Sequence, residues 1–244
     1  MSGQERFLDG RVIAAQPEAG FRAGLDAVML AAAVPALAGD EVLELGAGAG
    51  TASLCLAWRV PDCGVTGVEL DAALVELANR NSAANGFETR VRFAQADVFA
   101  LPPKLKRDFA HVFCNPPFHD TSGESSPDAA RGRALMDEGR LADWLAAGVK
   151  RAANGGSFTA ILRADRLGEA LASFPGRGVS VFPLWPRADA PAKRVIVQVL
   201  KGSNHPLALL PGLVLHEDDG RYTPAAESIL RDGAPLLVAE GRAL

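Results

Sequence analysis

Asn115, Pro116, Pro117 and Phe118 follow an apolar run directly, and their types suit the binding of a planar amine. Each proline fixes its own φ angle and lacks an N–H, so nearby backbone carbonyls stay free to accept hydrogen bonds. The Asn115 side chain adds a second acceptor, and Phe118 can stack on a flat ring. Two acceptors on one NH2 group draw its nitrogen towards tetrahedral geometry and free the lone pair. The tetrapeptide therefore predicts methyl transfer to an exocyclic amine. The alternative is a proline-stiffened turn with one core aromatic.

A glycine-rich stretch stands after an earlier apolar run and opens a helical pattern. It reads Glu44, Leu, Gly46, Ala47, Gly48, Ala, Gly50. Glycines at a strand-to-helix turn let the backbone approach a ligand without a Cβ in the way. A dinucleotide fingerprint needs a glycine where this chain has a threonine, directly after Gly50. The G-x-G-x-G spacing after an acidic residue instead resembles the first motif of S-adenosylmethionine-dependent methyltransferases, with tight strand-to-helix packing as the alternative.

Two carboxylates end the next two predicted strands. Glu69, followed by Leu70, lies 19 residues past Gly50. A carboxylate at that strand end can accept hydrogen bonds from both hydroxyls of a ribose. Asp97, followed by Val98, closes the third strand and could receive the amino group of an adenine. An Asp after a strand is equally a common helix N-cap, and both interpretations stay open for Asp97.

The Asn-Pro-Pro-Phe tetrapeptide, 115–118, follows the fourth predicted strand. Together with the glycine turn it resembles the amino-methyltransferases that modify adenine N6, guanine N2 or protein glutamine. A further segment comprises Gln16 and residues 20–30, with Arg22 and Asp26 within it. This segment and the tail 220–230 are similar to the bacterial tRNA1(Val) adenine-37 N6-methyltransferase family. The resemblance covers roughly residues 5 to 235. Arg22 and Asp26 are four apart on the expected first helix and can share a face there, an ordinary ion pair being the alternative.

The resemblance implies S-adenosylmethionine as cofactor, a structured tRNA as substrate, and adenine N6 as the methylated atom. It places the substrate base at residues 115–118. The cofactor contacts expected by position are Arg22, Asp26, Glu44, Gly46, Ala47, Gly48, Gly50, Glu69, Leu70, Asp97, Val98 and Asn115.

Several other functions remain as alternatives. His119 and Asp120 after the tetrapeptide resemble the NPPFH of ribosomal-RNA guanine-N2 methyltransferases. His119 itself is not expected to be catalytic, because a sulfonium leaving group needs no general acid. A protein-glutamine methyltransferase would carry an extra N-terminal domain, which roughly 40 residues before the first strand cannot hold. A small-molecule oxygen methyltransferase would have little use for paired acceptors. An NAD-dependent oxidoreductase or a non-catalytic module on this scaffold is a more distant alternative.

Short apolar runs alternate with helical patterns along the chain, which predicts a doubly wound α/β fold. We expect a mostly parallel, seven-stranded Rossmann-like methyltransferase sheet with an antiparallel C-terminal strand pair. The expected strands are 41–46, 63–70, 89–97, 109–114, 157–162, 178–185 and 193–202. The expected helices are 51–60, 71–86, 141–156 and 164–174. Asp71 should cap the second helix and Gly86 should end it. One domain, 1–244, would have a helical lead-in over 1–39 and an extension over 203–244. Residues 119–133 are too long for a simple connection, and we expect them to form a lid over the substrate base.

Composition limits the partners. The chain has 244 residues, 48% hydrophobic, with a net charge of −4, which excludes disorder and whole-surface binding of nucleic acid. Residues 177–201 include five basic residues and only one acidic residue, so a local RNA-binding face is compatible with the negative net charge. The candidates are Arg131, Arg133, Arg163, Arg166, Arg177, Arg187, Lys193 and Arg194.

Three cysteines without a C-x-x-C pair, no apolar stretch that could span a bilayer and no leader predict a cytoplasmic protein without a metal or membrane partner. The oligomeric state stays undetermined.

Overall fold

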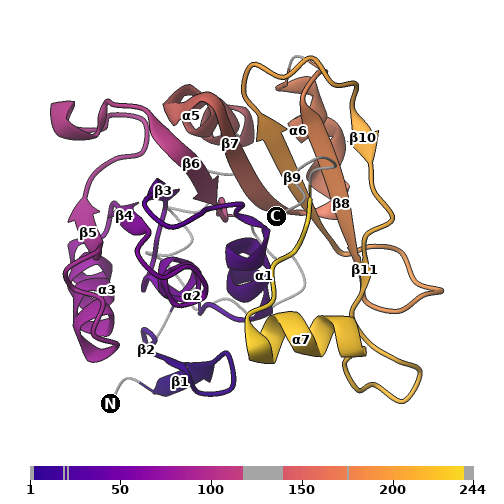
Figure 1. The fold of residues 1–244 in the computed structure, drawn as a ribbon, viewed down its shortest axis with the longest axis horizontal. Coiled ribbons are helices and arrows are strands. Elements are labelled where there is room, and N and C mark those ends of the chain that lie inside the picture. The colour runs from indigo at the N-terminus through magenta and orange to yellow at the C-terminus, as the bar shows by residue number, and fades with distance from the viewer. Residues whose placement is uncertain (1–2, 19, 21, 118–139, 175, 239–244) are drawn as a thin grey trace.

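The computed structural model describes residues 3–18, 20, 22–117, 140–174 and 176–238. Phe118 and the predicted lid, 119–133, lie outside the described residues. The sheet that organises the chain has nine strands in the order β10-β8-β9-β7-β6-β3-β4-β5, with β11 also paired to β8 (Figure 1). Its strands are β3 (Glu41–Leu45), β4 (Gly64–Glu69), β5 (Val91–Gln95), β6 (Phe109–Cys114), β7 (Ala152–Arg163), β8 (Val179–Trp185), β9 (Arg194–Leu200), β10 (Ala208–Leu209) and β11 (Leu213–Val214).

The predicted seven strands are confirmed, and β10 and β11 add two residues each at the edge. Strands β5, β4, β3, β6 and β7 pair in parallel, whereas β9 runs antiparallel to both β7 and β8. The expected antiparallel C-terminal pair is confirmed as β8 and β9, and β9 lies between β7 and β8. The five central residues of β9 are all buried, because a core covers each face of the sheet there and β7 and β8 flank its edges.

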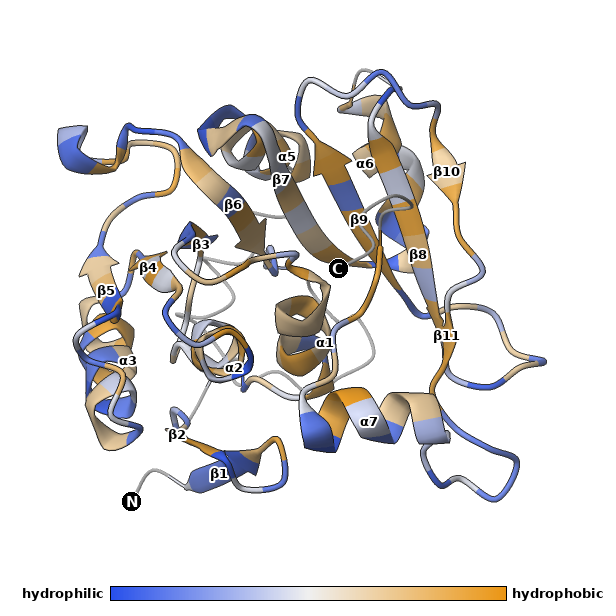
Figure 2. Ribbon diagram, in the orientation of Figure 1, coloured by the Kyte–Doolittle hydropathy of each residue, from blue (hydrophilic) through white to orange (hydrophobic). Residues whose placement is uncertain are grey.

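Two layers of helices cover the sheet (Figure 1). Helices α1 (Leu25–Ala33), α2 (Thr51–Arg59), α3 (Ala72–Ala84) and α7 (Pro224–Asp232) bury residues in one core. Helices α5 (Leu141–Arg151) and α6 (Leu167–Ala172) bury theirs in the other, against β6, β7 and β9. Short 3₁₀ turns η1 (Pro103–Leu105) and η2 (Ala164–Arg166) complete the second layer. Figure 2 shows apolar colours on most strands of the large sheet and on α1, whereas β1 is hydrophilic.

The lead-in differs from the expected helical segment. It opens with an antiparallel hairpin, β1 (Gln4–Phe7) and β2 (Val12–Ala15), and only then forms α1. Three consecutive residues of positive φ, Leu8, Asp9 and Gly10, make the turn. Phe7 and Val12 are buried beneath it, so tertiary packing holds a hairpin that its short strands could not hold alone.

The helix expected over 141–156 ends five residues early. Ala152 already pairs with Phe109, and Gly155 and Gly156 exchange backbone hydrogen bonds with Lys201. A Cβ on Gly156 would lie 2.2 Å from the Ala110 carbonyl oxygen. These glycines therefore serve close strand pairing and do not stop a helix. Around α3 the expectations are confirmed, because Asp71 accepts from Ala73 N at 2.9 Å and Gly86 has a φ of 70°.

Candidate active site

The glycine loop, Glu69 and the start of the tetrapeptide lie at one edge of the sheet. Parallel strands β4, β3 and β6 end there at Glu69, Leu45 and Cys114. Strand order reverses between β3 and β6, since β4 and β5 follow on one side and β7 on the other. Such a reversal opens a crevice beyond the carboxyl ends of the strands, where α/β folds bind ligands. The glycine loop after β3 and the tetrapeptide after β6 lie on the two sides of this point.

The three glycines of the loop have positive φ angles, and they meet different surroundings. A Cβ on Gly46 would lie 2.7 Å from the Trp144 ring, and one on Gly50 would lie 2.5 Å from the Phe93 ring. Close packing therefore accounts for these two. A Cβ on Gly48 would meet no atom within 4 Å. The backbone at Gly48 borders open space, as a loop that receives a cofactor requires.

Glu69 ties β4 to this loop. Its carboxylate accepts hydrogen bonds from Gly48 N at 2.9 Å, Leu70 N at 2.8 Å and Asp71 N at 3.0 Å. A carboxylate offers about four lone-pair sites, so one remains for a ligand hydroxyl. The next side chain, Leu70, is 59% exposed and gives the crevice an apolar face beside the carboxylate.

Glu44 lies inside the protein. It is 3% exposed, and its carboxyl accepts from Ser53 N at 3.2 Å and from the Ser53 hydroxyl. Desolvation raises the pKa of Glu44 from 4.5 to about 8, against the opposing effect of the Ser53 hydrogen bonds. Its contacts fix the first turn of α2 and hence the end of the glycine loop. Ala47, in that loop, is buried.

Asp97 and Val98 stand beyond β5, at the same edge. The Asp97 side chain is exposed, and its Oδ1 accepts from Phe99 N at 2.8 Å. A turn and no helix follows, so Asp97 closes a turn on itself and the helix N-cap interpretation is wrong. Val98 packs into the core beneath.

Asn115 carries a buried acceptor. Its Oδ1 is shielded from solvent and accepts no hydrogen bond from the described residues. Leaving a buried carbonyl without a donor costs about 1–3 kcal/mol, so its presence needs a reason such as a ligand. Pro116 is buried and Pro117 is exposed beside it. Of the acceptors that the tetrapeptide predicted, the structure shows the Asn115 Oδ1, and Phe118 is outside the described part.

Sequence reasoning missed two contributors. Trp144 of α5 packs against Gly46, and its ring meets Phe99 edge to face at 5.7 Å between centroids. Its buried Nε1 donates to none of the described residues. Asn81 of α3 donates to Ala49 O in the glycine loop at 2.9 Å. Both lie on helices far along the chain from the loop, and their helical spacing indicates only that they face inwards.

Arg22 and Asp26 do not form the pair that their spacing allowed. Helix α1 begins at Leu25, so Arg22 precedes it and pairs with Glu5 of the hairpin. Asp26 forms a 2.8 Å ion pair with Arg194 of β9. The expectation of one helical face was wrong because α1 starts later than its apolar pattern suggests. Both residues connect the lead-in to other elements.

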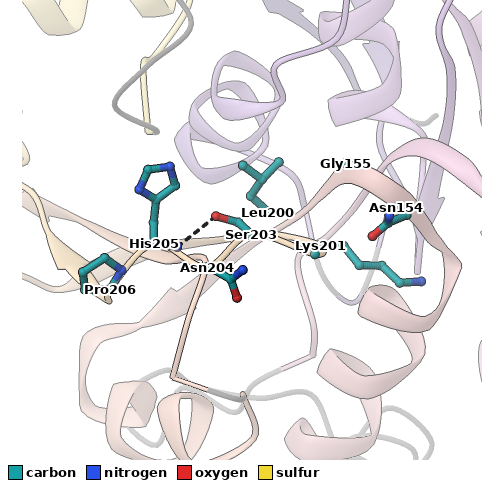
Figure 3. A pocket seen from close by; sticks show the side chains of 9 residues that line it. Asn154, Gly155, Leu200, Lys201, Ser203, Asn204, His205 and Pro206 are labelled. Carbon is teal, nitrogen blue, oxygen red and sulfur yellow. Dashed lines mark hydrogen bonds between the residues drawn. The ribbon is translucent and has the colours of Figure 1, made fainter.

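The predicted basic residues fall at two opposite edges. Arg163 and Arg166, at the carboxyl end of β7, pair with Asp165 and Glu169. Arg177 precedes β8, at the amino edge, and donates to Asn204 O. An open hollow of that edge is lined by Asn154, Lys201, Ser203, Asn204, His205 and neighbours, and it contains none of the predicted site residues (Figure 3). Arg131 and Arg133 lie outside the described residues.

Comparison with known proteins agrees with this geometry. Residues 23–138 match the model of the methyltransferase small domain. The tRNA1(Val) (adenine(37)-N6)-methyltransferase of Aeromonas hydrophila is 29% identical over 207 residues, covering 83% of this chain and 85% of that protein. The enzyme of the same description from Vibrio campbellii is 31% identical over 117 residues, so the match spans about half of either protein, 48% of each. A crystal structure from Agrobacterium tumefaciens, described as a predicted O-methyltransferase, superposes with a TM-score of 0.72 at 27% identity, covering 87% of this chain and 98% of that one.

The sheet order, the glycine loop and these matches define a class I methyltransferase. Within that class, the chain is similar to proteins described as tRNA1(Val) (adenine(37)-N6)-methyltransferases, and residues 23–138 match the methyltransferase small domain. Among the described residues no helix is long and apolar enough to cross a membrane. In the same part of the chain, no three potential metal ligands lie together.

Proposed function

We propose that this protein transfers a methyl group from S-adenosylmethionine to N6 of an adenine in tRNA, a cytoplasmic reaction. The observation that carries the proposal is the buried Asn115 Oδ1, which accepts no hydrogen bond from the described residues. It lies directly after β6, beside the end of β3, where the glycine loop begins. An acceptor held there without a donor suits an amine presented next to a methyl donor.

The residues fit S-adenosylmethionine at the crevice. Gly48 leaves space at its Cα, Glu69 retains an acceptor site for a ribose hydroxyl, and Leu70 offers an exposed apolar side chain. Arg22, Asp26, Asp97 and Val98 remain candidates by position. When bound, the cofactor supplies an electrophilic methyl group on a sulfonium, and the thioether left behind is neutral and needs no acid catalyst.

The chain's own task is to prepare the amine. Asn115 Oδ1 and a backbone carbonyl oxygen of the tetrapeptide each accept a hydrogen bond from one N–H group of the exocyclic amine. This draws the nitrogen out of conjugation and directs its lone pair along the line of attack. Such contacts are stronger in the transition state than in the bound substrate, which is how binding becomes catalysis. Phe118 is proposed to stack on the flipped base.

A substrate panel tests the assignment. Purified protein with labelled S-adenosylmethionine is offered unmodified tRNA, ribosomal RNA, duplex DNA, a release factor and small hydroxylated acceptors, and products are identified by nucleoside mass spectrometry. We expect N6-methyladenosine from tRNA. N2-methylguanosine from ribosomal RNA would instead make the guanine alternative correct, and methylated oxygen would exclude an amine acceptor. Nucleoside analysis of total RNA from a strain lacking the protein gives the cellular counterpart.

A further inference from the structure

Two arginines oppose each other at the edge that carries the site. Arg163, the last residue of β7, and Arg194, the first of β9, are direct partners in the antiparallel ladder. Like charges directly opposite across two strands destabilise a sheet. Each arginine has its own carboxylate, with Arg163 Nη2 2.6 Å from Asp165 and Arg194 Nε 2.8 Å from Asp26. A local conflict of this kind marks a functional requirement more often than a structural one.

The arginine of β7 lies beside the tetrapeptide. Cys114 pairs with Ala160, so the register, continued by three residues, brings Pro117 alongside Arg163. The side chains agree with this, since one hollow is lined by Pro116, Pro117, Leu141, Leu162, Arg163 and Arg166. Arg163 and Arg166 thus line a small hollow together with Pro116 and Pro117 of the proposed base-binding tetrapeptide.

Both guanidinium groups are held in place by acids on their own turn. The Arg163 side chain is 26% exposed and that of Asp165 is 59% exposed. Arg166 is 24% exposed, and its partner Glu169, at 2.7 Å, is 41% exposed. A guanidinium carries five N–H donors in a planar fork, whose geometry matches carboxylate and phosphate oxygens. Arginines ordered in advance lose less entropy when a further anion binds.

We propose that Arg163 and Arg166 bind backbone phosphates of the RNA on either side of the methylated nucleotide. The inference rests on the proposed function, because it assumes that a nucleotide delivers its base to Asn115. A base that enters between the tetrapeptide and the glycine loop leaves its flanking phosphates at the rim of the crevice. Phosphate is the anion whose shape matches a guanidinium fork. The role separates these two residues from the basic residues of the amino edge, which lie at the other end of the 12-residue strand β7.

A matched pair of double variants tests the assignment. Arg163→Gln with Arg166→Gln removes two charges at the carboxyl edge. Arg151→Gln with Arg177→Gln removes two at the amino edge, where Arg151 ends α5 and Arg177 precedes β8. Steady-state methylation of unmodified tRNA is measured at several salt concentrations, and affinity for S-adenosylhomocysteine is measured by calorimetry.

We expect KM for tRNA to rise at least about tenfold in the carboxyl-edge variant, with cofactor affinity unchanged. The slope of log affinity against log salt should fall by roughly 1.5, as loss of two phosphate contacts predicts. The amino-edge variant should change both values much less. Equal effects in the two variants, or an unchanged KM and slope in the first, would overturn the inference.

Stability provides a readout that separates binding from structure. Arg163→Gln loses the ion pair with Asp165, whose carboxylate is 59% exposed, and relieves the repulsion with Arg194. The urea midpoint of Arg163→Gln should therefore stay near that of the parent protein, and a large drop would indicate a structural role. If the parent protein methylates no adenine in tRNA, the proposed function fails. If it does and the carboxyl-edge variant matches it, only this inference fails.

Discussion

The side-chain amide of Asn81 donates a hydrogen bond to the carbonyl oxygen of Ala49, joining α3 to the glycine loop at 2.9 Å. The same side chain exchanges two further hydrogen bonds with Ala15 of β2, and Asn85, one turn later, does so with Ile13. The side-chain amides of Asn81 and Asn85, four residues apart, thus form the hydrogen bonds with the β2 backbone that a neighbouring strand would otherwise form. The hairpin, the helix and the loop form one supported unit.

Asn81→Ala should destabilise the protein by about 1–3 kcal/mol, because it leaves buried backbone groups of Ala15 and Ala49 without partners. It should also weaken S-adenosylhomocysteine binding, since the loop loses its support. Asn79→Ala is the matched control, because Asn79 exchanges the same pair of bonds with Phe93 and does not contact the loop. Urea unfolding and calorimetry compare them. Equal cofactor affinities in the two variants would show that the loop needs no support from α3.

Glu69→Ala should weaken the cofactor at least about tenfold, because charge-assisted hydrogen bonds contribute roughly 1.5–3 kcal/mol each. The variant loses the proposed ribose contact and also the bond from Gly48 N. Glu69→Gln keeps an acceptor for Gly48 without the charge and should lie between. Calorimetry with S-adenosylhomocysteine decides it, and unchanged affinity in Glu69→Ala would remove Glu69 from the site.

Asn115→Ala should reduce turnover on tRNA by about 10² or more, on the scale of losing one oriented polar group at a reacting centre. The Asn115 side chain donates to and accepts from none of the loop residues described, so cofactor affinity should stay within about twofold on this argument. Single-turnover methyl transfer with saturating tRNA measures the chemical step. Normal turnover in this variant would exclude the amine-holding mechanism for any substrate.

Phe118→Ala should chiefly weaken the RNA complex, because it loses stacking on the base worth about 1–3 kcal/mol.

Glu44 predicts a pH dependence of stability. In the unfolded chain its carboxyl ionises near pH 4.5, whereas in the folded protein burial raises the pKa to about 8. Between these values the folded state holds the proton more tightly, so the free energy of unfolding falls as pH rises from about 4.5 to about 8. Glu44→Gln should flatten this fall and stabilise the protein relative to the parent near pH 8. Urea midpoints from pH 5 to pH 8 measure it, and parallel curves for both proteins would contradict the raised pKa.

Local signals determined much of this protein. Apolar runs bounded by glycines located the parallel strands, because such strands are buried on both faces. The capping residue Asp71 and the terminal Gly86 bounded α3, since their backbone preferences act within a few residues. The glycine spacing and the Asn-Pro-Pro run indicated a methyltransferase, because the conformational limits of glycine and proline belong to the residues themselves.

Tertiary structure alone decided how those segments meet. No local pattern says that β9 enters between β7 and β8, that Trp144 fills the space beside Gly46, or that Asn81 supports the loop, since each depends on a partner distant in the chain. Arg22 and Asp26 had the spacing of an ion pair, yet each bound another element because α1 begins at Leu25. Likewise, nothing in the sequence distinguishes Arg163 from the other basic residues, and only the register of β7 against β6 places it beside Pro117. Sequence spacing limits what one element can present, and only packing between elements decides which side chains share a site.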